Sequence, residues 1–255
     1  MASHGPSSSS AGQMTAKDLV SPATGSRSSM TNRLRTAGAL KLLALLSTIA
    51  GLVDVIGFLR LGHVFTAHIT GNLVLLLAGP VGAGQTPLAQ LLSIPVFAVS
   101  VAAAYLVARR SGPCPGRELL IAHALLLFLV LALALKERAE GPSLVVVTAM
   151  TAVAAVAFQN AFIRASLHED WVTSVMTGNV ATSIVALVGL LRPGPWTREE
   201  SLRKLRTTAP LVLGFVAGCL TGATSASRLG AWAWSIPAAL SVVAVATWAP
   251  RSACQ

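Results

Sequence analysis

Charged residues are scarce in this chain of 255 residues. They make up 11% of it, against about 25% in soluble domains, and only 9 are acidic beside 19 Lys and Arg. Hydrophobic residues reach 54%, and the mean hydropathy is +0.70. So little charge argues against a soluble enzyme and indicates an all-α protein that crosses a membrane several times.

Cysteines are also few. Cys114, Cys219 and Cys254 show no paired spacing, which excludes a disulfide scaffold and a metal ribbon of the CxxC kind. The stretch GPVGAGQT at 79–86 resembles a phosphate-binding loop, but Gln85 stands where that motif needs a lysine. Signatures of serine hydrolases, zinc proteases and kinases are missing. We therefore expect no enzyme activity, no metal and no cofactor.

Apart from Asp54, the charged residues lie between long apolar blocks. A spanning helix needs about 20 apolar residues to cross a hydrocarbon core of roughly 30 Å, and block 67–79 is too short without its flanks. Lys and Arg between the blocks are topology signals, so the net charge of +10 does not predict nucleic acid as a partner. The blocks cover 42–59, 67–79, 88–108, 119–135, 143–163, 172–191, 207–227 and 229–250.

Residues 1–32 differ from the rest because they are rich in Ser, Ala and Gly and have no long apolar run. Such a segment buries too little surface to fold, and it lacks the apolar stretch of a signal peptide. We expect a disordered cytoplasmic tail, followed by a single transmembrane domain over 33–250.

One motif occurs twice, as HVFTAHITGN at 63–72 and DWVTSVMTGN at 170–179. Upstream, Asp54 aligns with Asn160 when one residue is inserted; downstream, Pro95 aligns with Pro210. Three elements that recur in one order indicate two homologous halves, 38–135 and 143–250.

The orientation of the halves depends on whether the two TGN segments cross the membrane. If both enter and leave on one side, six helices span, and 13 of the 17 Lys and Arg residues from Arg33 onward lie inside. With eight spans only 11 do, so the positive-inside rule favours six spans and a 3+3 inverted repeat. Eight spans remain the alternative, because block 172–191 is long enough to cross.

The pairing of VDVIGF at 53–58 with FQNAFIR at 158–164, each followed by a TGN, resembles the YoaK-like family of bacterial membrane proteins. The resemblance covers about 38–245. It implies a bacterial multi-pass membrane protein and no particular biochemical activity.

Asp54 is the only acid within an apolar block, where a charged residue costs about 2.5–3.5 kcal/mol at mid-helix. The functional interpretation is a proton or cation site in a transport path. The structural interpretation is a hydrogen-bonded residue that joins two helices. The aligned Asn160 keeps a polar group but no titratable one.

The TGN elements are the second candidate. Thr and Asn cap exposed backbone N–H groups, and Gly permits close approach, so each element suits a helix start or an unwound break near a ligand. Close helix packing explains them equally well. His68, two residues before Thr70, is the histidine best placed for proton transfer, because His63 and His123 fit interfacial or buried structural positions.

Three glycines, Gly214, Gly218 and Gly222, stand four residues apart and so share one helix face. In lipid this spacing lets two helix backbones approach closely, so we expect these glycines to serve helix packing.

These observations predict an inner-membrane permease for an unknown small solute, with a proton as coupling ion and a cytoplasmic N terminus. The alternative is a non-transporting membrane protein with a structural, sensing or partner-binding role. The expected partners are the lipid bilayer and the solute, and a homo-oligomer is left open. The residues predicted to form the substrate or ion path are Asp54, His68, Thr70, Gly71, Asn72, Gln159, Asn160, Thr177, Gly178 and Asn179.

Overall fold

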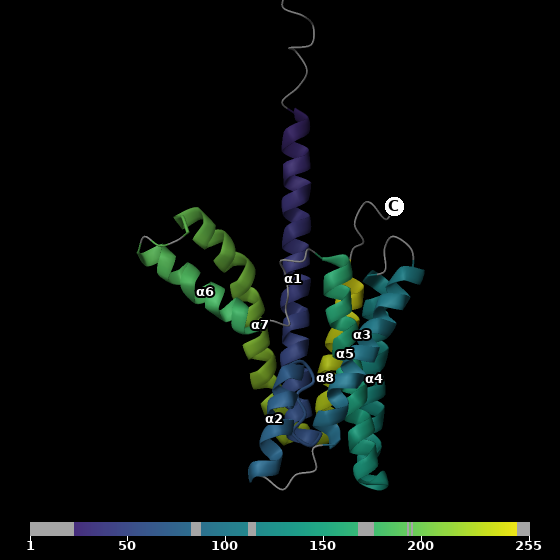
Figure 1. Cartoon of the computed structure of the whole chain (residues 1–255). Coiled ribbons are helices and arrows are strands. Elements are labelled where there is room, and N and C mark those ends of the chain that lie inside the picture. Colours follow the sequence, from purple (N-terminus) through teal and green to yellow (C-terminus); the bar gives the residue numbers. More distant parts are fainter. Residues whose placement is uncertain are drawn as a thin grey trace, which may run out of the picture. The chain divides into compact units, whose positions relative to one another are not determined.

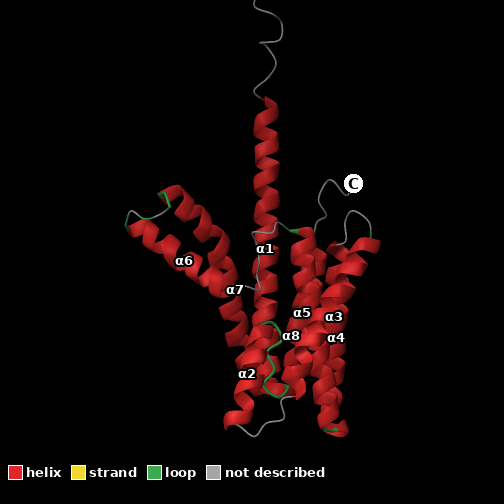
Figure 2. Ribbon diagram, viewed as in Figure 1, coloured by secondary structure: helices red, strands yellow, loops and turns green. Residues whose placement is uncertain are grey.

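The computed structural model describes residues 23–82, 88–111, 116–167, 176–192, 194 and 196–248, and within them every regular element is a helix (Figure 2). The chain divides into two units, Met1–Gly38 and Ala39–Gln255. The elements are α1 (Ala23–Arg60), α2 (Ile69–Gly82), α3 (Leu88–Arg110), α4 (Gly116–Glu140), α5 (Pro142–Ser166), α6 (Met176–Leu191), α7 (Arg198–Leu229), the 3₁₀-helix η1 (Gly230–Trp234) and α8 (Ser235–Thr247).

In the first unit, α1 begins at Ala23. Residues 23–32 form its first part, and the disorder expected of the Ser-rich tail stays a prediction. Residues 1–22 of the predicted tail lie outside the described residues.

Five helical stretches of the described chain are long and apolar enough to cross a membrane. They are Ala37–Arg60, Leu88–Arg110, Gly116–Lys136, Ser143–Ser166 and Arg198–Thr247, the last of which contains α7, η1 and α8. Helices α2 and α6 are shorter, with 14 and 16 residues. Each begins one residue before a Thr-Gly-Asn triplet.

The central helix of the second unit is α1. In the most apolar stretch of α1, 67% of the residues are buried inside the protein, whereas only 11% are buried in that of α3. Helix α3 therefore exposes most of its side chains. Helix α5 packs against α3 and α4, and α4 also packs against α8 (Figure 1). Fully buried side chains between these helices include Leu43, Leu46, Ile49, Leu52, Leu119, Leu120, Leu127, Phe162 and Trp234.

Helix α7 contacts α1 through its three regularly spaced glycines. A Cβ on Gly214 would lie 2.6 Å from the Ala44 carbonyl oxygen, and one on Gly222 would lie 3.1 Å from that of Leu52. A Cβ on Gly218, between them, would collide with the backbone of Thr48. Two helix axes approach this closely only where one of them has no side chains at the contact.

The N terminus of α7 is fixed by a capping box. Thr197 Oγ1 accepts a hydrogen bond from the Glu200 backbone N–H at 3.2 Å, and Glu200 Oε2 accepts one from the Thr197 N–H at 2.8 Å. This reciprocal pair satisfies two N–H groups that the helix leaves free. Helix α7 consequently starts at Arg198, earlier than the apolar block at 207–227 predicted.

Candidate functional site

The segment between α1 and α2, residues 61–68, makes a tight turn that begins with two left-handed residues. Gly62 has φ 72° and His63 has φ 60°, a conformation that costs a side-chain-bearing residue about 1–3 kcal/mol unless its surroundings hold it. Here Gln90 of α3 holds it, because its Nε2 donates to the carbonyls of Gly62 at 3.0 Å and His63 at 3.3 Å.

Asn72 of the first TGN element fixes the same segment from the other side. Its Oδ1 accepts from the Phe65 N–H at 2.8 Å, and its Nδ2 donates to the Phe65 carbonyl at 2.6 Å and to Ser93 Oγ at 2.9 Å. Gly71, beside it, allows the Phe65 ring to approach, since a Cβ there would lie 2.9 Å from that ring. Asn72 is fully buried and its amide is used inside the protein.

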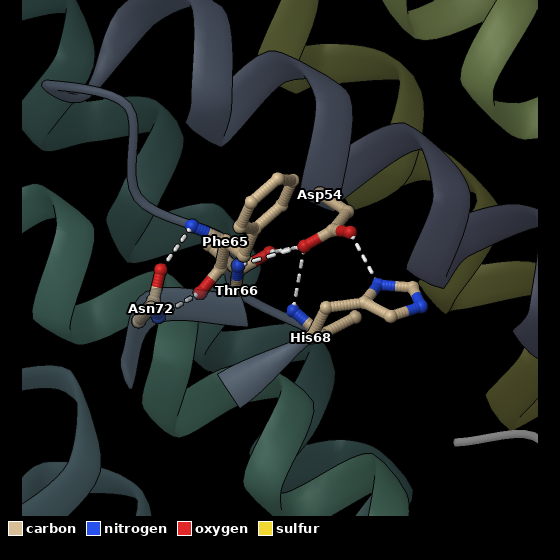
Figure 3. A network of polar contacts seen from close by, with 6 residues as sticks. Asp54, Phe65, Thr66, His68 and Asn72 are labelled. Atoms are coloured by element: carbon tan, nitrogen blue, oxygen red, sulfur yellow. Dashed lines mark hydrogen bonds and ion pairs between the residues drawn. The ribbon is translucent and has the colours of Figure 1, made fainter. Parts of the chain in front are cut away.

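Asp54, in the C-terminal third of α1's apolar stretch, is buried and is the third support of this segment. Its contacts are drawn in Figure 3. Its Oδ1 accepts from the backbone N–H groups of Thr66 and Ala67, each at 2.8 Å, and from Thr66 Oγ1 at 3.5 Å. Oδ2 lies 2.6 Å from His68 Nδ1. These hydrogen-bond donors replace the water that the carboxylate loses on burial. They therefore offset the free-energy cost of burying it.

His68 immediately precedes α2, outside the spanning stretches. Its ring lies edge-on to Phe65 and to Phe215 of α7, with centroid distances of 6.3 and 5.4 Å. The hydrogen bond to Asp54 raises the pKa of His68 above its ordinary value of 6.5, burial opposes this, and the charge of Asp54 adds to the rise. The imidazole thus holds a proton more readily than a free histidine.

A small pocket opens beside His68, with room for about one water molecule. Two further polar side chains line it, Gln159 and Asn160 of α5. Gln159 Nε2 donates to the Leu46 carbonyl at 3.0 Å, which leaves Oε1 buried with no hydrogen-bond partner in the described structure. The remaining lining residues are Ala50, Ala67, Val156, Met176 and Phe215.

The predicted path residues therefore separate into three groups. His68, Gln159 and Asn160 line the pocket, and Asp54 reaches it through His68. Asn72 and Gly71 act on the 61–68 segment instead, and Thr70 and Thr177 are exposed. Gly178 and Asn179 are partly buried near the start of α6, where Met176 borders the pocket; the first part of the second motif, up to Val175, lies outside the described residues.

Several residues of the site were not predicted. Gln90 and Ser93 of α3 and Phe65 support the segment, and Phe215 closes one side of the pocket. Only Gln90 gave a sequence signal, because it is an amide within an apolar block. In the described part of the chain no three His, Cys, Asp or Glu side chains gather in a way that could hold a metal ion.

The fold and this site define a multi-pass helical membrane protein in which a buried acid, Asp54, pairs with a partly exposed histidine, His68. Over residues 42–247 the chain matches the family described as "Protein of unknown function (DUF1275)", and it belongs to that family. It is 71% identical over 35 residues to a UPF0700 transmembrane protein, YoaK, of Bacillus subtilis (strain 168), a match that covers 14% of this chain and 16% of that relative. The resemblance to YoaK-like proteins is thereby confirmed. No solved structure matches the chain.

Proposed function

We propose that this protein is a permease of the bacterial inner membrane that couples the passage of a small solute to a proton carried by Asp54 and His68. The observation that supports this most directly is the partly buried 2.6 Å contact between the two side chains beside a pocket. Ion-pathway acids within membranes face such cavities, whereas a purely structural acid needs no titratable partner there.

The proposed architecture has six spans, arranged as two inverted halves: α1, α3, α4, α5, α7, and η1 together with α8, whose 5 and 13 residues follow one another without a break. At 1.5 Å per residue, α2 and α6 extend about 21 and 24 Å, which is short of the roughly 30 Å hydrocarbon core. Three crossings per half turn the second half upside down. The N terminus is then cytoplasmic, and only Arg60, Lys136, Arg138 and Arg228, of the Lys and Arg from Arg33 onward, lie outside.

In this proposal both halves contribute to the pocket. Ala50, Ala67 and His68 come from the first half, and Gln159, Met176 and Phe215 come from the second. A site shared between two halves opens to alternate sides when the halves rock against each other. The narrow pocket corresponds to a closed conformation.

The acid–histidine pair also provides the coupling. A charged carboxylate binds the N–H groups of Thr66 and Ala67 more strongly than a neutral one does. A proton on His68 strengthens its contact with the charged carboxylate, and loss of that proton weakens it, so the charge of the pair acts on the segment before α2. The proton and the position of α2 are linked in this way without any covalent chemistry, so the protein acts as a carrier and not as an enzyme.

The test compares small-molecule pools in cells that lack the protein, overproduce it, or overproduce Asp54→Asn at equal membrane abundance. Wild-type protein should change the level of at least one solute in a way that depends on the proton gradient, and Asp54→Asn should not. Identical pools in all three strains, or equal activity of the variant, would contradict the proposal.

The tight pocket favours a second candidate function, that of a non-transporting membrane protein with a structural or sensing role. The two differ in water access. Ala67→Cys and Asn160→Cys, each in a background free of Cys114, Cys219 and Cys254, should react with a water-soluble thiol reagent if the pocket opens, and should stay unreactive from both sides if it never does.

A further inference from the structure

We propose that the pocket beside His68 binds an ammonium group, either the ammonium ion itself or the head of a primary amine, with Gln159 Oε1 and Asn160 Oδ1 as acceptors. This inference rests on the proposed function and names the class of solute. Its basis is the set of polar atoms that the protein leaves available around the pocket.

The two amides are oriented by their own bonds. Gln159 Nε2 faces the Leu46 carbonyl and Asn160 Nδ2 faces the Val156 carbonyl at 3.1 Å. Since a carbonyl oxygen accepts and does not donate, the nitrogen of each amide must point to it, and the oxygen is the atom left over. Gln159 Oε1 is buried and has no hydrogen-bond partner in the described structure.

Gln159 is 1% exposed, so its free acceptor is cut off from bulk water. A buried acceptor without a partner is costly, and native proteins leave few of them. This acceptor borders the pocket, so a bound donor can satisfy it.

The third polar group is the imidazole of His68. With Nδ1 bonded to Asp54, only Nε2 remains for other partners, and it accepts a hydrogen bond when the ring is neutral. Because Asp54 raises the pKa of His68, the ring is neutral only at a pH above its ordinary value of 6.5, and in that state the pocket presents acceptors only, beside a buried carboxylate. No Lys or Arg is among its lining residues.

The shape of the pocket limits the ligand further. Space for about one water molecule fits an ammonium ion, which has a similar size, but not a larger charged group. The Phe215 ring adds an aromatic surface of the kind that attracts cations. Potassium is a poorer match, because it needs a full shell of oxygen ligands and cannot donate a hydrogen bond to imidazole.

Thermal unfolding of the purified full-length protein in detergent tests the proposal, with ammonium chloride, methylammonium chloride or potassium chloride at equal ionic strength. Ammonium should raise the unfolding midpoint in a saturable manner, whereas potassium should not. A response to ammonium alone assigns the free ion, and a response to both nitrogen cations assigns a primary amine; either supports the proposal. No saturable response to either, or an equal response to potassium, overturns it.

Two matched variants locate the site. Gln159→Met removes the buried acceptor and should weaken ammonium binding about tenfold or more. Ser201→Ala removes another buried oxygen that lacks a partner in the described structure but does not line the pocket, so it should retain ammonium binding. If Gln159→Met does not fold, Asn160→Leu replaces it with the same expected loss. Binding that survives loss of the pocket acceptor overturns the assignment.

The binding measurement is independent of transport. Absence of ammonium binding in a protein whose Asp54-dependent transport is intact would remove this inference and leave the proposed function standing. Ammonium binding that depends on Gln159, in a protein that changes no solute pool, would support the binding site and contradict the proposed transport function.

Discussion

His68 Nδ1 and Asp54 Oδ2 lie 2.6 Å apart, and this contact joins the pocket to the one acid in the apolar part of α1. The same carboxylate binds the N–H groups of Thr66 and Ala67 through its other oxygen. Local backbone structure and a titratable pair are therefore connected through a single side chain, and the predictions below separate these two roles.

Replacing Asp54 tests its role in holding the segment before α2. Asp54→Ala leaves two backbone N–H groups without their acceptor and should lower the free energy of unfolding by about 2–5 kcal/mol. Asp54→Asn keeps one acceptor oxygen and should cost less than Asp54→Ala. Chemical unfolding in detergent micelles measures both, and an Asp54→Ala variant as stable as wild type would contradict this structural role.

The His68 pair predicts a pH dependence. Because the folded-state pKa of His68 is raised, protonated His68 stabilises the fold. This stabilisation is fully present below the ordinary pKa of 6.5 and is lost as the pH rises through the higher folded-state value. The difference in unfolding midpoint between wild type and His68→Gln should therefore be largest near pH 6 and shrink toward pH 9. A constant difference across this range would show that the charge of His68 is not involved.

Asn72 is expected to be a structural residue. Asn72→Asp keeps the shape but removes both donors and places a carboxylate oxygen against the Phe65 carbonyl and Ser93, so it should destabilise the protein by about 2–4 kcal/mol. Thr70→Ala, at an exposed position two residues earlier, should change stability by no more than about 0.5 kcal/mol. Equal effects of the two changes would remove Asn72 from the support of this segment.

Gly218→Ala tests the contact between α1 and α7. The added methyl group meets the backbone of Thr48, which cannot move without shifting the helix, so the expected loss is about 1–3 kcal/mol or more. Gly38→Ala, where a Cβ would meet nothing within 4 Å, is the control and should be neutral or slightly stabilising. Loss of stability in the control alone would contradict the packing role of Gly218.

The proposed six-span topology has a direct test. A reporter fused after Ser111 should be cytoplasmic with six spans and external with eight, and one fused after Gly141 should give the opposite result in each case. Alkaline phosphatase, active only outside, and a fluorescent protein, fluorescent only inside, provide the two readouts. A pair of sites that reports external after Ser111 and internal after Gly141 would contradict the proposed six-span topology with a cytoplasmic N terminus.

The apolar blocks of the sequence determined the class of protein, because a run of about 20 apolar residues has few alternatives to a spanning helix. They also singled out Asp54, since a lone acid in such a run is conspicuous. For residues 1–32, composition predicted a tail that does not fold by itself, and this stays a prediction.

What the sequence could not determine is which groups meet. The two TGN elements were predicted to surround a path, yet Asn72 bonds the Phe65 backbone and Ser93, while His68, Gln159 and Phe215 border the pocket. The hydropathy of a segment depends only on the residues within that segment, so it can be calculated from the sequence. The direction in which a polar side chain finds its partner depends on how distant helices pack, and for Asp54, Thr66, His68 and Gln159 only the tertiary structure decided it.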